Sequence, residues 1–389
     1  MTHLADLPVS ERTPQRSVDR LRQFIIEHAL PLWSSSGFDD QAGCFHERLD
    51  FNGLPPNLPR RLMVQCRQIA AYARASILKW SDAGQPRALR AFEMLRNRYY
   101  AADGLPGWVF SVHPDGRIAD STRDLYAHAF VIYMLAWVYR MTSDPGLLSL
   151  ADTTLSDVDR IFGAENGLGL LSAPDRFHIR EQNPHMHLFE ALLALAEASG
   201  ADRHLARAGA LVDLFDAALA DATTGIVRET FDGHWRPVRP AGQNVFEPGH
   251  QMEWAWLLRE WQRLTGADVN QRVDRLLASA TRFGLDSMNG SVRSTVQENG
   301  VAIPSGSRIW PQSEAIRVLC REDPRGTAWP GLVSQITNYL FAKHLPGQLH
   351  GGWIDQVTEA GTAAVDYMPA STLYHLVGAA IDSEQALGF

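Results

Sequence analysis

Apolar residues recur three and four positions apart along most of the chain. The pattern is clear in stretches such as "QCRQIAAYARASILKW", "HAFVIYMLAWVYRM" and "HMHLFEALLALAEAS", which are also rich in alanine and leucine. This spacing places the apolar side chains on one face of a helix. Stretches with the alternating pattern of a half-buried strand are scarce, and connections such as "AADGLPGWVFSVHPDGR" have the glycine, proline and aspartate content of turns and short hairpins. The chain is therefore predicted to be mainly helical.

Unusual polar and aromatic side chains recur at the predicted starts of every second helix. Positions 61, 126, 187, 250, 314 and 375 represent the series, and they are separated by 65, 61, 63, 64 and 61 residues. Each step has room for one helix, a loop, a second helix and a return loop. The members of the series are Arg61 with Gln65, Tyr126 with His128, Asn183 with His187, His250 with Glu253, Trp310 with Glu314, and Tyr374 with His375.

The helices between these positions lack such starts. We expect them near residues 16–32, 86–100, 145–162, 203–219, 268–283 and 327–343. Six helical hairpins of this kind can close into an all-α ring of six inner and six outer helices. Because the inner helices would all begin at the same end, their first turns and the adjoining loops would line one pocket. No linker or composition shift divides the sequence, so residues 1–389 are expected to form a single domain, with residues 1–13 as a disordered start.

Composition and charge argue against several classes of function. The chain has 389 residues, is 45% hydrophobic and carries a formal net charge of −8 without any run of lysine and arginine, which argues against a nucleic acid or an anionic membrane as a partner. Three widely spaced cysteines do not form a disulfide framework or a zinc cluster and fit a reducing compartment. The longest apolar run, 129–139, is too short to span a bilayer, and the N-terminus lacks a signal-peptide pattern. We expect a soluble cytoplasmic protein that is a monomer or a homodimer.

Three histidines are expected to project into the predicted pocket: His187, His250 and His375. An unperturbed imidazole has a pKa of about 6.5 and exchanges protons near neutral pH. Two of them on opposite sides of a substrate carbon could remove a proton from one atom and return it to a neighbour, which is enolisation chemistry. Glu190 and Glu253 each follow a histidine by three residues. Each glutamate is expected to fix the tautomer of its histidine or to contact the substrate, although a purely structural hydrogen bond would produce the same spacing.

Metal binding is the main alternative for these pairs, since two His-x-x-Glu pairs on different helices resemble a dinuclear carboxylate site. The four carboxylates typical of such a site are not evident at the helix starts, so no metal or other cofactor is predicted. Of the two histidines in "HMH", His185 and His187 face different sides of a helix. His187 is preferred for the pocket because it shares its spacing with Asn183 and Glu190.

Donors and aromatic faces in the same stretches suggest a sugar. Arg61 and Gln65, one turn apart, offer donors for hydroxyl or carbonyl oxygens. Trp254, Trp310 and Trp353 offer flat apolar faces, and sugars commonly need both kinds of contact, although aromatic residues at helical spacing often belong to the core. There is no glycine-rich phosphate loop before a helix and no serine or cysteine nucleophile motif.

Six stretches together resemble the N-acylglucosamine 2-epimerase superfamily. In chain order they are "RLMVQCRQ", "YAHAF", "NPHMHLFEALLAL", "EPGHQMEWAWLL", "RIWPQSEAIR" and "GGWIDQ…YMPASTLYHL", and they extend from about residue 61 to residue 380. The resemblance implies an (α/α)6 barrel, in agreement with the six-hairpin period. Within the superfamily, "EPGHQMEWAWLL" is most similar to the D-mannose isomerases. Cellobiose 2-epimerases tend to have an Asp-Ile-Glu-Ala-Ser version of this stretch, and "NPHMHL" keeps a histidine that N-acylglucosamine epimerases replace.

The resemblance implies an enzyme that interconverts the monosaccharides D-mannose and D-fructose, and also D-lyxose and D-xylulose, through a cis-enediol without a metal. It implies that His250 and His375 are the acid/base pair and that His187 assists ring opening or binding. The substrate-binding residues it implies are Arg61, Tyr126, Asn183, Glu190, Glu253 and Trp310.

Three alternatives stay open at this point. The first is a 2-epimerase of the cellobiose or N-acylglucosamine type. The second is a non-catalytic sugar-binding or interaction protein, which retention of all three histidines speaks against. The third is a phosphorylated or sulfonated sugar substrate, for which Arg123, Arg180 and Arg308 are candidate anion contacts.

Overall fold

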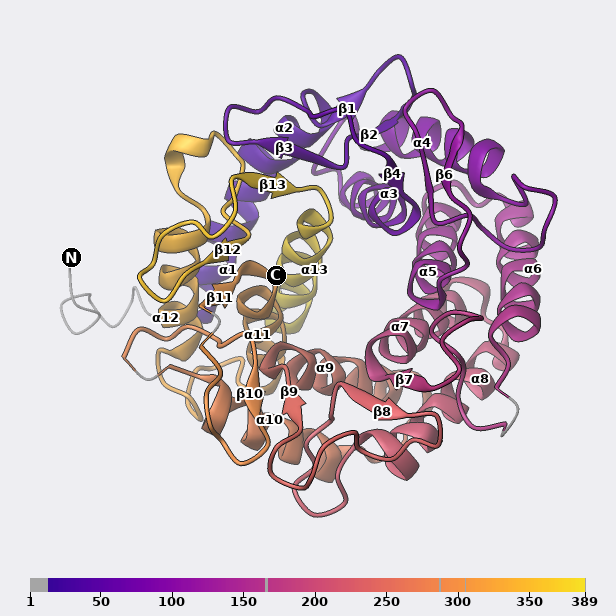
Figure 1. The fold of residues 1–389 in the computed structure, drawn as a ribbon. Helices are drawn as coiled ribbons and strands as arrows, with labels where there is room; N and C mark the ends of the chain where they lie inside the picture. The colour runs from indigo at the N-terminus through magenta and orange to yellow at the C-terminus, as the bar shows by residue number, and fades with distance from the viewer. Residues whose placement is uncertain (1–12, 165–166, 287, 305, 389) are drawn as a thin grey trace.

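Two concentric rings of helices surround one axis in the computed structural model, which describes residues 13–164, 167–286, 288–304 and 306–388 (Figure 1). Within these residues the inner ring consists of α3 (Leu62–Ile77), α5 (Leu125–Thr142), α7 (Gln182–Ser199), α9 (Pro248–Thr265), α11 (Ile309–Glu322) and α13 (Thr372–Leu387). The outer ring consists of α1 (Pro14–Phe24) with η3 (Ile25–Ala29) and α2 (Leu30–Ser34), α4 (Gly84–Tyr99), α6 (Pro145–Phe162), α8 (Asp202–Leu214) with η4 (Phe215–Leu219), α10 (Asn270–Gly284), and α12 (Leu332–Tyr339) with η5 (Leu340–His344) and the short turn η6 (Gly347–Leu349).

The inner helices contact one another in chain order, and α13 returns to α3 to close the ring. Each inner helix also packs against the outer helix that follows it in sequence or, for α13, against α1. The prediction of an all-α barrel of six helical hairpins is confirmed. α6 begins and ends at the two residues that the sequence pattern predicts, 145 and 162.

Burial patterns explain which helices lie inside. α5 is apolar on nearly every side, as its sequence "LYAHAFVIYMLAWVYRMT" shows, and most of its side chains are buried. A helix that is apolar all round is stable only when neighbours cover every face. The outer α10 instead buries one stripe, made of Val273, Leu276, Leu277 and Ala280, and exposes the opposite face. The two patterns place the helices in two layers.

Short antiparallel strands tie the loops together at one end of the barrel. The strand before most inner helices pairs with a strand in the loop that precedes the next inner helix around the ring. The pairs are β4 (Arg60–Arg61) with β5 (Ser111–Val112), β5 with β6 (Ile118–Asp120), β7 (Ile179–Glu181) with β8 (Thr230–Asp232), β9 (Val245–Phe246) with β10 (Val296–Gln297), β11 (Ser307–Arg308) with β12 (Gln356–Val357), β13 (Tyr367–Pro369) with β3 (Arg48–Asp50), and β1 (Phe38–Asp39) with β2 (Cys44–Phe45).

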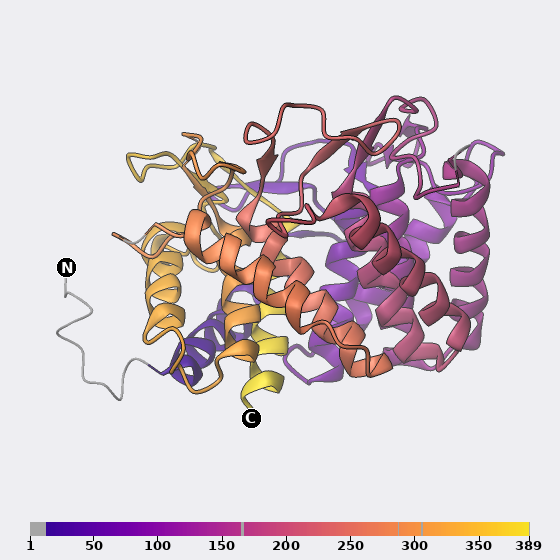
Figure 2. The same cartoon turned by 90° about the horizontal axis from the view of Figure 1, so that it is seen from below.

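These loops lie along one end of the barrel in the side view, and the C-terminus of α13 lies at the other end (Figure 2). All the inner helices therefore begin beneath the same layer of loops. We call this layer the crown, defined by strands β3 to β13. Side chains in the first turns of the inner helices point toward the space under the crown, as the sequence period predicts.

Buried glutamines hold the loops to the inner helices. The side-chain amide of Gln65 accepts from the backbone N–H of Phe45 at 3.0 Å and donates to the carbonyl of the same residue at 2.9 Å. Gln251 and Gln312 make the same two bonds to Val227 and Val292. Gln65 was expected to offer donors to a sugar. Its amide is fully buried and occupied, so that expectation is wrong.

Helix α13 packs against both α1 and α3, so the last helix closes the ring against the first hairpin. We propose on this basis that the chain is a single catalytic domain. Residues 1–12 lie outside the described residues, and the disorder expected for them stays a prediction. Thr13, the last residue of the stretch 1–13 for which disorder was expected, is ordered and caps α1 by accepting from the N–H of Arg16. Among the described helices, none has an apolar stretch of the length that a bilayer requires.

Leu376 tests the packing of this closing helix. Its side chain is fully buried on α13. We expect Leu376→Ala to lower the free energy of unfolding by about 2–5 kcal/mol, because it leaves a cavity in a tightly packed core. The control Leu54→Ala, at a side chain that is 63% exposed, should change it by less than about 0.5 kcal/mol. Denaturant titration followed by circular dichroism measures both, and a cost at Leu376 as small as that of the control would contradict the packing.

Candidate active site

A pocket of about 580 Å³ lies under the crown at the starts of the inner helices. Its wall includes side chains from β3, β4 and β11 and from the first turns of α3, α5, α11 and α13. Arg61, Tyr126, Trp310 and His375 line it, as the sequence analysis expected, and Arg67 lines it as well.

His250 lies at the start of α9 among carboxylates. Its Nδ1 is 2.9 Å from Oε2 of Glu229 and 3.9 Å from Oε2 of Glu247. Burial lowers the pKa of this imidazole, but the two carboxylates outweigh burial and raise the pKa to about 9. Gln182 holds Glu229 in place by donating to it at 2.9 Å, while its own carbonyl oxygen accepts from the indole N–H of Trp254. His250 is therefore an imidazolium near neutral pH.

His375 lies in the first turn of α13 and has the opposite environment. Burial, together with the positive charge of Arg67 and the neighbouring His187, moves the pKa of this imidazole well below 6.5. Its Nδ1 is 2.8 Å from Oε1 of Glu314, whose other oxygen accepts from Arg317 at 3.1 Å. His375 is therefore neutral. In the tautomer in which Nδ1–H donates to Glu314, the lone pair of Nε2 is free.

Trp310 lies between the two imidazoles. Its ring centroid is 4.9 Å from that of His250 and 5.6 Å from that of His375, with both ring pairs tilted by 35°. An imidazolium and a neutral imidazole thus contact the same indole. Environments that push the pKa values of two titratable groups apart in this way identify an acid and a base.

His187 lies deeper, on α7, against the rings of Tyr126 and Phe130 at centroid distances of 5.0 and 4.7 Å. Burial lowers its pKa to about 4, despite the Oε2 atom of Glu190 at 3.0 Å from its Nδ1. Burial alone would raise the pKa of Glu190, but hydrogen bonds and positive charge around it, including the hydroxyl of Tyr374, lower the pKa to about 2.

Glu253 is the unusual carboxylate of the pocket. It is 1% exposed, and neither of its carboxylate oxygens has a hydrogen-bond partner among the described residues. Burial and the nearby carboxylates of Glu314 and Glu190 raise its pKa well above the ordinary value. The raised pKa favours the protonated form of Glu253, which has a hydrogen bond to offer.

Among the described residues, three groups of side chains have ligand atoms close enough together for a metal ion. They are His187 with Glu190 and Glu253, Glu253 with Glu314 and His375, and Glu229 with Glu247 and His250. Arg317 already supplies positive charge beside two of these carboxylates, at 3.1 Å from Glu314 and 4.0 Å from Glu190. The expectation that no metal is needed stays a prediction.

The arginine nearest the centre is Arg67, whereas the sequence pointed to Arg61. The side chain of Arg61 is 44% exposed at the rim, where it forms an ion pair with Glu47. Arg67 is 5% exposed, donates to the hydroxyl of Tyr126 and lies 4.8 Å from the ring centroid of Tyr374. Among the described residues it has no ion pair with a carboxylate, so its charge is available to a bound molecule.

Residues 43–379 match the N-acylglucosamine 2-epimerase (GlcNAc 2-epimerase) family. The chain belongs to this family. It is 30% identical over 388 residues to a mannose-6-phosphate isomerase of Rhizobium meliloti, covering 94% of this chain and 96% of that one. It is 26% identical over 359 residues to a cellobiose 2-epimerase of Bacteroides fragilis, covering 86% and 89%. Its fold matches the crystal structure of a D-mannose isomerase with a TM-score of 0.83 at 21% identity, over 94% of this chain and 97% of that one.

Family membership makes the chain an enzyme of sugar isomerisation. The barrel brings together most of the residues that the sequence analysis selected for it. Asn183 contributes an Oδ1 atom that is buried without a hydrogen-bond partner among the described residues, and it lies one turn before His187 on α7. His185 faces away, as predicted, and bonds the backbone N–H of Leu170 at 2.9 Å.

The sequence analysis did not select two residues of this site, Glu229 and Arg67. Glu229 lies in the loop before β8, with no helical spacing that links it to His250. Arg67 is a charged residue in the alanine-rich run "QCRQIAAYARAS", and a charge inside such a run was the available signal.

Two of the three candidate anion contacts are also corrected. Arg123 forms an ion pair with Asp103, Arg180 donates to backbone carbonyls, and neither is among the residues that line the pocket.

The absence of a side chain at Gly249 leaves space for the indole ring of Trp310, which contacts both histidines. A Cβ atom at this position would lie 2.5 Å from the ring of Trp310 and 3.0 Å from Pro311. We expect Gly249→Ala to displace Trp310 and to lower kcat/KM by about tenfold, since overpacking of this kind costs about 1–3 kcal/mol. Gly209→Ala on α8, where the nearest atom would be at 3.5 Å, should leave kcat/KM unchanged. Steady-state kinetics on both variants is the measurement, and equal values for both would refute this role of Gly249.

Proposed function

We propose that this enzyme is an aldose–ketose isomerase that interconverts D-mannose and D-fructose, with D-lyxose and D-xylulose as a second pair. The observation that carries the proposal is the pair of histidines of opposite protonation state that both contact Trp310. An isomerase needs a base for the C2 proton and an acid for the carbonyl oxygen, and His375 and His250 are prepared for these roles before the substrate arrives.

In the proposed reaction the open-chain aldose binds with C2 beside Nε2 of His375 and O1 beside His250. His375 takes the proton from C2, the freed electron pair forms the C1–C2 double bond, and O1 takes the proton of His250. The product of this step is a cis-enediol. The hydroxyl at O2 then returns a proton to His250 as the C2 carbonyl forms, and C1 takes the proton that His375 carries. Both histidines end in their starting states.

The other groups support binding and ring opening. The uncompensated charge of Arg67 stabilises negative charge that develops on O1 and O2. Protonated Glu253 and neutral His187 are a donor and an acceptor for opening the sugar ring. Tyr126, Asn183 and Glu190 contact hydroxyl groups, Trp310 covers a C–H face of the sugar, and Arg61 acts from the rim.

A 2-epimerase is the second candidate, and the cellobiose 2-epimerase relative favours it. The same enediol gives the epimer when a proton returns to C2 from the opposite face. The mannose-6-phosphate isomerase relative covers more of the chain at higher identity and favours the isomerase. Product analysis by NMR after incubation of mannose in deuterated water separates the two. We expect fructose, with any deuterium at C1; a C2-deuterated epimer without ketose would refute the isomerase.

A phosphorylated substrate is a further candidate because of arginines at the rim. The guanidinium of Arg48 lies 4.1 Å from the ring centroid of Tyr367, and that of Arg308 is 3.6 Å from Asp355. Both line the pocket. Mannose 6-phosphate therefore belongs in the substrate panel beside mannose, lyxose and cellobiose. If kcat/KM for mannose 6-phosphate exceeds that for mannose by more than about tenfold, the phosphate ester and not the free sugar is the substrate.

Removal of either imidazole should abolish turnover. We expect His375→Asn and His250→Gln each to lower kcat by about 10²–10⁴, the usual contribution of a positioned acid or base. The matched control is His234→Gln, an exposed histidine in a crown loop, which should keep the parent kcat. Ketose formation by chromatography measures all three, and a purely sugar-binding protein would show no turnover in the parent.

The opposite pKa shifts predict the pH profile. His250 must be protonated, and its pKa is raised to about 9, so activity should fall as pH rises through about 9. His375 must be neutral, and its pKa is well below 6.5, so activity should persist below pH 6.5. We expect kcat/KM to be nearly flat between about pH 6.5 and 8.5. An acid limb centred near 6.5, the value of a free imidazole, would contradict the environment described for His375.

A further inference from the structure

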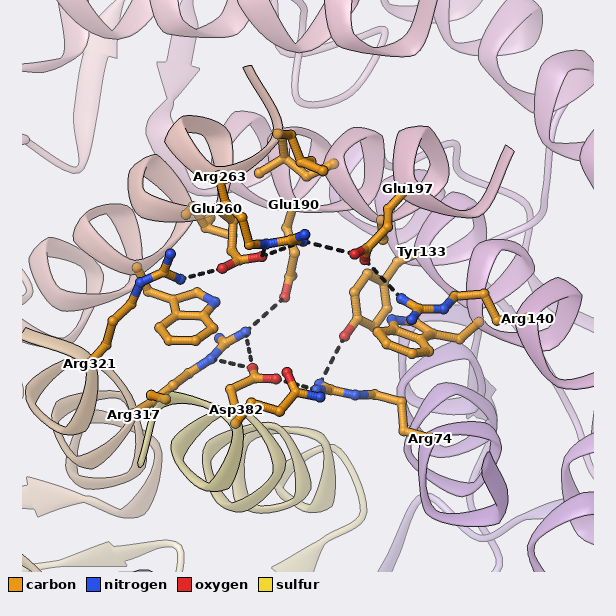
Figure 3. Close-up of a pocket in the computed structure, with 18 residues that line it drawn as sticks. Arg74, Tyr133, Arg140, Glu190, Glu197, Glu260, Arg263, Arg317, Arg321 and Asp382 are labelled. Atoms are coloured by element: carbon orange, nitrogen blue, oxygen red, sulfur yellow. Dashed lines mark hydrogen bonds and ion pairs between the residues drawn. The ribbon is translucent and has the colours of Figure 1, made fainter. Parts of the chain in front are cut away.

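A second cavity, of about 480 Å³, opens at the end of the barrel opposite the crown (Figure 3). Arginines and carboxylates from all the inner helices line it, and aromatic rings lie between them. They are Arg74 from α3, Arg140 from α5, Glu190 and Glu197 from α7, Glu260 and Arg263 from α9, Arg317 and Arg321 from α11, and Asp382 from α13. We call this cavity the lower well.

The rim of the lower well is a ladder of ion pairs. Glu197 accepts from Arg140 and Arg263, both at 2.9 Å, and Glu260 pairs with Arg263 at 2.8 Å and with Arg321. Each member of the ladder thus has an opposite charge as its neighbour. These pairs are partly exposed.

The floor of the lower well is buried and leads toward the active site. Asp382 lies between two arginines there. One of its oxygens pairs with Arg74, and the other accepts from Nε and Nη2 of Arg317 at 2.7 and 2.6 Å. All three side chains are at most 6% exposed. The two bonds from Arg317 to one oxygen use one edge of the guanidinium and leave Nη1 pointing away from Asp382.

Nη1 of Arg317 points at the partner of a catalytic histidine. It donates to Oε2 of Glu314 at 3.1 Å, and Oε1 of Glu314 is 2.8 Å from Nδ1 of His375. A continuous series of hydrogen bonds therefore runs from Asp382, through Arg317 and Glu314, to His375. Figure 3 shows its lower part, where Arg317 reaches both Asp382 and Glu190.

Guanidiniums and carboxylates are buried together along this axis. The guanidiniums are those of Arg67, Arg74 and Arg317, and the carboxylates are those of Glu190, Glu314 and Asp382. Burial raises the pKa of Glu314, Arg317 opposes that shift, and Asp382 adds to it. The contribution of Asp382 is therefore the position of Arg317, which would be free to turn away from Glu314 without it.

The other groups around His375 do not replace this arrangement. Arg67 of α3 and His187 of α7 lower the pKa of His375, and Glu190 of α7 raises it. The ring of Trp310 covers one side at 5.6 Å, and that of Tyr374 lies at 4.7 Å. Only Glu314, among the described residues, is within hydrogen-bond distance of Nδ1.

We propose that Asp382 is a positioning residue of the active site: it fixes Arg317, which holds Glu314 against Nδ1 of His375 and thereby keeps the proton of this imidazole on Nδ1. The lone pair of Nε2 then faces the substrate. Without Asp382, Arg317 no longer holds Glu314 against Nδ1, the proton of His375 is free to move to Nε2, and the base is lost. The role assigned to Nε2 rests on the proposed isomerase function, but the tautomer itself does not.

The tautomer of His375 in the ligand-free protein is the direct test. Correlation spectra of ¹⁵N-labelled histidine side chains distinguish Nδ1–H from Nε2–H, and the signal of His375 is assigned by its loss in His375→Asn. We expect Nδ1–H in the parent and a population of Nε2–H in Asp382→Asn. The kcat of this variant should fall by about tenfold or more while KM changes by less than about twofold, because Asp382 does not reach the sugar.

Glu197→Gln is the matched control, since it removes one carboxylate of the same cavity without touching the series. It should keep the Nδ1–H tautomer and the parent kcat. Asp382→Asn retaining the parent tautomer would overturn the proposal. A parent protein that isomerises no aldose, with the tautomer shift still present, would instead refute the proposed function and leave the positioning role intact.

A second variant keeps the test decisive if Asp382→Asn does not fold. The double variant Arg74→Met with Asp382→Asn removes one buried cation together with one buried anion and preserves the charge balance. It should fold and show the shifted tautomer. Arg74→Met alone leaves the bonds between Asp382 and Arg317 in place and should keep Nδ1–H, and a shift in this variant as large as in the double variant would also overturn the proposal.

Discussion

Compensation of buried charge is the constraint on which the site depends. An ionised group without a partner in a protein interior is costly by several kcal/mol, so each one must find an opposite charge or change its protonation state. Arg317 satisfies the rule by pairing with Asp382 and Glu314, and Glu253, which has no such partner, has a pKa raised well above its ordinary value. The two catalytic histidines obey the same rule. His250 is charged because carboxylates surround it, and His375 is neutral because burial and Arg67 oppose a second positive charge.

The crown holds the first turns of the inner helices at the same level of the barrel. Strand pairs join each loop to its neighbour, and buried amides such as Gln251 fix the height at which an inner helix begins. The first turns therefore lie at one level around the axis. Glu229 reaches His250 for the same reason, since the Gln251 amide anchors Val227, two residues before it. The groups of the site meet because the loops are held, although they lie far apart in the sequence.

The recurrence of polar helix starts every 61 to 65 residues was enough to predict the barrel and to bring His187, His250 and His375 to one end of it. Periodicity could not distinguish a side chain that faces the substrate from one that holds a loop. Gln65 has the spacing of a pocket residue, but its amide is consumed by the backbone of Phe45.

The spacing of polar residues along the chain also could not predict contacts between different helices and loops. Glu229 follows no helical spacing, and the rim position of Arg61 depends on its ion pair with Glu47. The sequence did carry one unused signal. Arg67, Arg317 and Asp382 interrupt apolar runs of inner helices, and charges in such runs indicate a buried ion-pair network.

Neutron diffraction from crystals of the ligand-free, deuterium-exchanged protein near neutral pD tests the central claim most directly, because it locates the protons on both imidazoles. The account predicts deuterium on both ring nitrogens of His250, on Nδ1 alone of His375, and on one oxygen of Glu253. A neutral His250, or a His375 that carries deuterium on Nε2, would contradict it.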